Sequence, residues 1–210
     1  MLTFDQAFSL FSISFLLALS PGPDNIFVLT QSAVWGRRSG LLVVLGLCTG
    51  LIGHTVAVAV GLAAVFASSA TAFNVLKWAG AAYLVYLAWG AWRAGAVTSR
   101  PRQGTPAMSD GQLYRRGIVM NLTNPKVSIF FLAFLPQFTN PAQGSVALQI
   151  LSLGALIILS TLIVFSLIAW FAGLLGDRLQ ESARAQIWLN RIAGTVFLGL
   201  AIRLALSERT

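Results

Sequence analysis

Six apolar runs occupy most of this chain, and each is about as long as the hydrocarbon core of a lipid bilayer requires. They cover Ala7 to Val34, Gly40 to Phe66, Ala72 to Trp92, Gly117 to Phe138, Val146 to Leu175 and Ile187 to Leu206. An apolar helix of about 20 residues spans a membrane. Hydrophobic residues make up 57% of the sequence and charged residues only 10%, too few polar groups to cover a soluble fold. The pattern predicts an all-α, polytopic membrane protein with six transmembrane helices.

A polar segment between the third and fourth runs divides the chain into two halves of three runs each. It is rich in Ser, Thr, Pro and Gly, a composition typical of a loop. We expect one membrane domain over residues 1–210, with a first repeat at about 1–93, a linker at about 94–114 and a second repeat at about 115–210. The N-terminal run lacks the basic region of a signal peptide, and we expect it to be retained.

Basic residues gather in alternate loops. The loops after the first, third and fifth runs carry nine: Arg37, Arg38, Arg93, Arg100, Arg102, Arg115, Arg116, Arg178 and Arg184. The other side carries three, namely Lys77, Arg203 and Arg209. Because cytoplasmic loops are enriched in Lys and Arg, this asymmetry predicts that both termini lie outside. The basic residues form no stripe interleaved with aromatic residues, so we expect the lipid bilayer as the partner and no nucleic acid.

Two of the six runs contain proline-rich breaks beside an ionisable residue. The first run reads Ser20-Pro21-Gly22-Pro23-Asp24-Asn25, and the fourth reads Asn121-Leu122-Thr123-Asn124-Pro125-Lys126. Proline removes a backbone donor and interrupts a helix. An offset of 102 residues places Asp24 over Lys126. Interrupted helices at corresponding places in two halves indicate a transporter binding site, so we expect two inverted three-helix repeats with broken first and fourth helices.

The breaks also suggest what such a site would bind. Backbone groups exposed by a break must face protein or a watery cavity. The half-helices starting near Asp24 and Lys126 offer positive N-terminal ends to a carboxylate, Lys126 adds a full charge, and Asp24 suits an ammonium group. The candidate substrate-binding residues are therefore Ser20, Pro21, Gly22, Pro23, Asp24, Asn25, Asn121, Asn124, Pro125 and Lys126.

Structural roles compete with this interpretation. Asp24 and Lys126 could only pair with each other and hold the two halves together, although charges inside a membrane are costly and usually functional. Asn121 could cap a helix end. Pro21 and Pro23 are better explained as residues that fix the break than as residues that touch substrate.

His54 is the only histidine, and it lies within the second run. It titrates near neutral pH, so His54 and Asp24 are the candidates to carry a coupled proton. The alternative role for His54 is a hydrogen bond between helices. Gly46 and Gly50 allow close helix approach. We favour packing within one protomer, with Cys48 as a packing residue, and a homodimer as the second possibility.

Other functional classes find little support. One His and one Cys leave little from which to build a catalytic set, so we expect no enzyme, no cofactor and no resident metal ion. A soft-metal exporter is disfavoured for the same reason. An exporter of a cation bound by carboxylate and backbone carbonyl ligands stays open as the alternative function.

The two break motifs, together with the glycine series Gly36, Gly40, Gly46 and Gly50, resemble the LysE/RhtB family of amino-acid exporters. The resemblance extends over essentially the whole chain, including its length and the position of the linker. It implies a secondary transporter of the threonine, homoserine and leucine efflux type. Such a protein exports amino acids or close derivatives across the bacterial inner membrane by exchange with protons.

Overall fold

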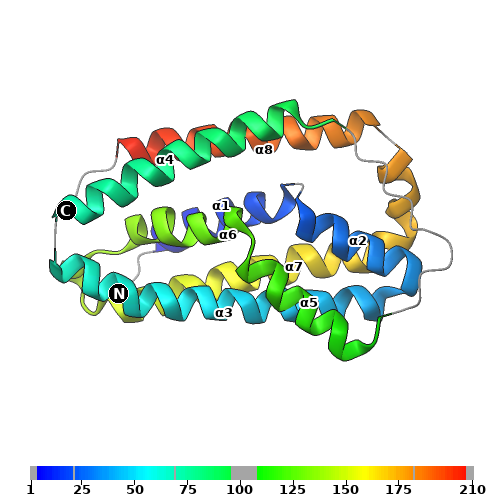
Figure 1. Cartoon of the computed structure of the whole chain (residues 1–210), viewed down its shortest axis with the longest axis horizontal. Helices are drawn as coiled ribbons and strands as arrows, with labels where there is room; N and C mark the ends of the chain where they lie inside the picture. Colours follow the sequence, from blue (N-terminus) through cyan, green and yellow to red (C-terminus); the bar gives the residue numbers. More distant parts are fainter. Residues whose placement is uncertain (1–3, 21, 69, 96–107, 182, 207–210) are drawn as a thin grey trace.

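We describe the protein from a computed structural model, which covers residues 4–20, 22–68, 70–95, 108–181 and 183–206. Throughout these residues the secondary structure is helical, with no strand, as the apolar runs predict. The helices lie along one long axis (Figure 1). Helices α4 and α8 form one layer and α3, α5 and α7 form another, with α1 and α6 between them.

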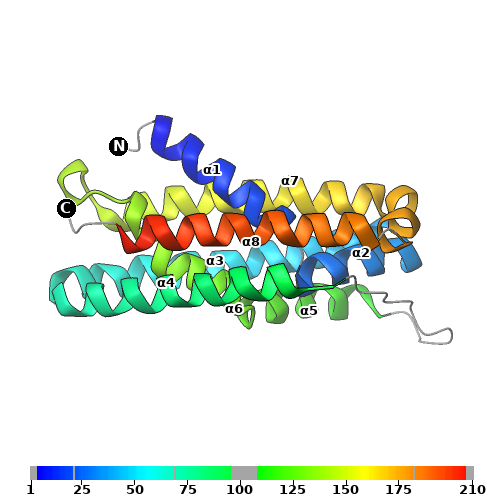
Figure 2. The same ribbon diagram turned by 90° about the horizontal axis from the view of Figure 1, so that it is seen from above.

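The first half contains four helices, and the first two form one bent unit. Their bounds are α1 (Phe4–Leu19), α2 (Pro23–Trp35), α3 (Arg37–Ser68) and α4 (Ala70–Arg93). The axes of α1 and α2 differ by 63°. Seen from above, the N-terminal part of α1 tilts away from the other helices (Figure 2).

The second half starts with a similar bent unit. Its α-helices are α5 (Asp110–Leu122), α6 (Pro125–Ile129), α7 (Val146–Glu181) and α8 (Ala183–Ala205). Helix α6 continues into a π-helical turn, η1 (Phe130–Phe134), and a 3-10 turn, η2 (Leu135–Phe138); a further 3-10 turn, η3 (Pro141–Gln143), precedes α7. The segment Pro125–Phe138 is bent by 49° from α5.

The structure supports part of the predicted set of spans. Within the described residues, Arg37–Gly61 and Val146–Ala172 are long and apolar enough to cross a membrane, and each bent pair would add one span, giving up to four. The apolar part of α8, Asn190–Ile202, is shorter than a full span. The six-span inverted arrangement therefore stays a prediction.

Close backbone contact joins α3 to α5. A Cβ atom on Gly46 would collide with the carbonyl oxygen of Tyr114, and one on Gly117 would collide with that of Val43. A Cβ on Gly50 would meet the side chain of Asn121 at 2.7 Å. The small residues of α3 thus serve packing within the protomer, as expected. The buried Cys48 lies in the apolar cluster around this contact.

The apolar core consists of two clusters. One is built on the four phenylalanines that follow Lys126, together with residues from α1, α3, α4, α7 and α8. The other joins α2 and α3 to α7 through residues such as Val28, Val44 and Phe165. The two broken segments come together between these clusters.

Candidate functional site

The break between α1 and α2 is held by side chains that bind the end of α1. Gly22 is the N-cap of α2 and Pro23 is its first residue, a position where the missing N–H of proline costs nothing. The last carbonyls of α1 have no partner inside the helix. Lys126 Nζ donates to the carbonyl oxygens of Leu17 (3.4 Å) and Ser20 (3.2 Å), and Asn25 Nδ2 donates to that of Ala18 (2.7 Å).

The break between α5 and α6 is capped by its own residues. Asn124 is the N-cap of α6, and its Oδ1 accepts from the backbone N–H of Lys126 at 3.0 Å. At the end of α5, the Thr123 hydroxyl donates to the carbonyl oxygen of Val119 at 2.7 Å. The backbone donors expected to receive a substrate carboxylate at this helix start are therefore partly used by Asn124.

Besides the two bonds from Lys126, a hydrogen bond between two side chains crosses between the breaks. Asn124 Nδ2 donates to Asp24 Oδ2 at 2.8 Å, and both side chains are buried. The described residues include one ion pair, Arg38–Asp110, and it lies at the surface. Asp24 and Lys126 therefore share a neighbourhood without forming a direct ion pair. Each charge lies at a favourable helix end, Asp24 in the first turn of α2 and Lys126 against the C-terminus of α1.

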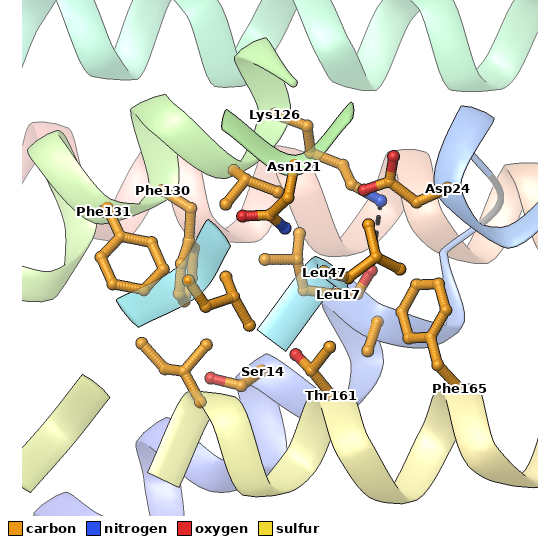
Figure 3. A pocket seen from close by; sticks show the side chains of 14 residues that line it. Ser14, Leu17, Asp24, Leu47, Asn121, Lys126, Phe130, Phe131, Thr161 and Phe165 are labelled. Atoms are coloured by element: carbon orange, nitrogen blue, oxygen red, sulfur yellow. Dashed lines mark hydrogen bonds between the residues drawn. The ribbon is translucent and has the colours of Figure 1, made fainter. Parts of the chain in front are cut away.

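A pocket opens beside this junction, where the two apolar clusters meet (Figure 3). It contains about 440 Å³ of space that no protein atom fills, part of it open to the outside. Its polar side chains are Ser14, Asp24, Asn121, Lys126 and Thr161. Its apolar lining comprises Leu17, Ala18, Leu47, Leu51, Val127, Phe130, Phe131, Ile157 and Phe165.

Several polar oxygens at the pocket are buried and have no hydrogen-bond partner among the described residues. They are Asp24 Oδ1, Asn121 Oδ1 and Ser14 Oγ. A buried acceptor without a partner costs free energy, so such groups usually serve a ligand, a water molecule or a moving part. The pocket thus combines two acceptors, a lysine ammonium and a largely apolar wall. This arrangement can hold a small molecule that carries both charges.

A comparison with known proteins identifies the family of the chain. The family model described as LysE type translocator matches residues 15–208. The chain belongs to the LysE type translocator family. It is thus a transporter and not an enzyme.

Two relatives illustrate the range of this translocator family. The chain is 38% identical over 205 residues to a homoserine/homoserine lactone efflux protein of Salmonella typhimurium, covering 97% of this chain and 98% of the relative. It is 25% identical over 192 residues to a leucine efflux protein of Enterobacter sp. strain 638, covering 91% of each. No solved structure is significantly similar to the chain.

The translocator brings together three of the ten candidate residues in one pocket, namely Asp24, Asn121 and Lys126. The others lie around it. Asn124 and Ser20 bind Asp24 and Lys126, Asn25 binds the end of α1, and a Cβ on Gly22 would lie 3.3 Å from Lys126 Nζ. Pro23 and Pro125 are exposed first residues of their helices, and Pro21 lies outside the described residues.

His54 lies behind the pocket wall. Its Nε2 is 3.3 Å from the carbonyl oxygen of Asn121, and its ring stacks on Phe131 with centroids 5.4 Å apart. His54 therefore joins α3 to α5 by a hydrogen bond, which is the structural role considered for it from the sequence. Whether it also carries a proton stays a prediction.

The sequence pattern missed the hydroxyls of Ser14 and Thr161 and the aromatic wall of Phe130 and Phe131. The two phenylalanines begin the π-helical turn that follows α6, and Pro136 lies one turn further on. Proline cannot donate to the preceding turn, and π-helical turns are frequent at functional sites. The sequence feature that could have indicated this aromatic wall is Pro136, the second proline in the apolar run that follows the break.

Proposed function

We propose that this chain exports a small amino acid across the bacterial inner membrane in exchange for protons, through a zwitterion site between its two broken helices. The observation that supports it most directly is the pocket, which the Asp24 carboxylate and the Lys126 ammonium both line from different halves of the chain. Relatives whose names describe homoserine, homoserine lactone and leucine efflux support the substrate class.

The substrate ammonium group would bind at Asp24 and Asn121. Both side chains have an oxygen that is buried and has no hydrogen-bond partner within the described part of the chain. The two acceptors belong to different halves of the protein. An ammonium ion offers three donors, so it can satisfy both oxygens at once.

The substrate carboxylate would bind at Lys126. The ammonium of Lys126 donates to two main-chain carbonyls at 3.2 and 3.4 Å, near the long end of the range for such bonds. A carboxylate is a stronger acceptor for an ammonium group than a neutral carbonyl is. Substrate would therefore draw Lys126 away from the end of α1 and couple binding to the geometry of the first break.

The two-repeat topology that this mechanism needs has support in the helix contacts. Helix α5 packs on α3 as α1 packs on α7, while α3 pairs with α7 and α4 pairs with α8. These are the contacts that an exchange of the two halves would preserve. The first and last described residues lie at the same end of the molecule (Figure 1), as six crossings require. We infer that both termini face outside, opposite to Arg37, Arg38, Arg93, Arg115 and Arg116.

Transport by purified protein tests the proposal. Liposomes containing the protein are loaded with a labelled amino-acid panel and placed in acidic medium. We expect at least one amino acid to leave faster than from liposomes without a pH difference, because protons enter as it leaves. If no amino acid moves and a metal ion is transported instead, the cation-exporter alternative replaces this function.

Two variants assign the proton. Asp24→Asn should abolish the effect of the pH difference or transport itself, because Asp24 is the carboxyl group in the pocket. His54→Gln should retain the effect, because His54 lies outside the pocket lining. The opposite result, a normal pH effect in Asp24→Asn and none in His54→Gln, would assign the proton to His54.

A further inference from the structure

The pocket has a second polar side, away from its charged residues. Ser14 of α1 and Thr161 of α7 lie across the pocket from Asp24, Asn121 and Lys126 (Figure 3). The two residues are 2% and 8% exposed, respectively. Helices α1 and α7 pack against each other, so the two hydroxyls come from neighbouring elements. Apolar side chains fill most of the remaining wall.

Ser14 differs from three hydroxyl groups in α3 and α7. Thr49, Thr55 and Ser152 each donate to a carbonyl oxygen four residues earlier in their own helix, the usual solution for a hydroxyl in an apolar segment. Ser14 Oγ is buried and has no such partner within the described residues. A buried hydroxyl without a partner is unfavourable unless another molecule satisfies it.

We propose that Ser14, with Thr161 beside it, determines specificity by hydrogen bonding to a hydroxyl group on the substrate side chain. The proposal rests on the zwitterion site described above. With the substrate charges held at Asp24, Asn121 and Lys126, the side chain of the amino acid extends across the pocket toward Ser14 and Thr161. The pocket therefore selects short hydroxylated amino acids over analogues of equal size with a methyl group in place of the hydroxyl.

The physical basis of this selectivity is the free-energy cost of leaving the protein hydroxyls without a hydrogen-bond partner. A site built to bind a hydroxyl rejects the analogue that lacks it, because the protein hydroxyls then lose their partner. An apolar wall alone would accept the methyl analogue at least as well. One neutral hydrogen bond corresponds to about threefold to tenfold in selectivity.

Paired substrates test the proposal. Proteoliposomes loaded with labelled homoserine and norvaline, or with threonine and valine, compare a hydroxyl with a methyl group at constant size. We expect the wild-type protein to favour the hydroxylated member of at least one pair. Ser14→Ala should reduce that preference by about threefold to tenfold. Thr161→Val, which keeps the side-chain shape, should reduce it as well.

Ser152→Ala is the matched control, because its exposed hydroxyl on α7 binds its own helix and lies outside the pocket. It should leave the preference unchanged. If Ser14→Ala and Thr161→Val both transport with the wild-type preference, Ser14 does not determine specificity and the proposal is wrong, while amino-acid export stands. If the wild-type protein transports none of the four amino acids but transports others, this proposal alone fails. If it transports no amino acid at all, the proposed function fails with it.

Discussion

The break between α5 and α6 supplies its own caps, whereas the break between α1 and α2 depends on a side chain from the other half of the chain. Asn124 and Thr123 satisfy backbone groups of their own segment. At the first break, Gly22 offers no side-chain cap, and Lys126 reaches the carbonyls of Leu17 and Ser20 from more than 100 residues away.

This difference shows that two motifs at matching positions in the sequence can be stabilised by different kinds of contact. The second break can form once its own residues are in place, because each cap is local. The first break is complete only when the second lies beside it. The geometry of the first break therefore depends on the position of Lys126 in the second half.

Loss of Lys126 should have the largest effect. Lys126→Met keeps the chain length but removes both bonds to the end of α1. We expect a loss of about 3–6 kcal/mol in stability, since each of the two hydrogen bonds from the charged group contributes about 1.5–3 kcal/mol. Thermal unfolding of the detergent-purified protein measures the loss. Lys77→Met, at the other lysine of the chain, removes a contact with the Trp78 ring, whose centroid is 5.4 Å from Nζ, and should cost less than the change at Lys126.

A second change separates the role of charge from that of the hydrogen bonds. Asp24→Asn in the Lys126→Met background removes the carboxylate that remains buried, so the double variant should accumulate better than Lys126→Met alone. Transport should stay lost because both charged groups have gone. Strictly additive losses of abundance would contradict an interaction between Asp24 and Lys126.

Asn124 should have the next largest effect, because it serves both breaks. Asn124→Ala removes the α6 cap and the bond to Asp24, an expected loss of about 2–4 kcal/mol. Asn124→Ser restores a capping oxygen without the amide donor, and should recover about 1 kcal/mol of that loss. Asn140→Ala is the control, because Asn140 caps only the short turn η3. A loss at Asn140 equal to that at Asn124 would contradict a special role for the bond to Asp24.

The smallest effects are expected from two single side-chain hydrogen bonds, one at each break. Asn25→Ala removes the bond to Ala18 at the first break and should cost about 1 kcal/mol in thermal unfolding. Thr123→Val removes an exposed bond within α5 at the second break and should stay within about 0.5 kcal/mol. An equal or reversed order would show that the first break does not depend more on its side-chain caps than the second.

The charged part of the site was predictable from sequence because its signals are local. Proline beside Asp24 and Lys126 within apolar runs indicates a helix break that lipid cannot solvate, whatever the tertiary structure. The 102-residue offset predicted that the two breaks lie close together, and a hydrogen bond joins them in the structure. It did not identify Asn124 as the hydrogen-bond partner of Asp24, because an alignment compares positions and not the reach of side chains.

The hydroxyl side of the pocket was not predictable in this way. A serine in an apolar helix usually donates a hydrogen bond to its own backbone. In the sequence, Ser14 and Ser152 both lie within apolar runs, so the sequence does not distinguish them. Only the packing of α1 on α7 distinguishes them. The all-helical class followed directly from the apolar runs. The number of spans did not, because within the described residues neither α4 nor α8 qualifies as a full span, and α8 has only a short apolar stretch between Asn190 and Ile202.

The glycine contact between α3 and α5 determines which parts of the molecule are free to move. Their backbones touch at Gly46 and Gly117, so a sliding motion of one helix along the other would drive side chains into main-chain atoms. If transport involves movement of helices, we expect α3 and α5 to move as one rigid body. A hinge would then be expected at Thr123 and Asn124, directly after α5, where Asn124 also binds Asp24.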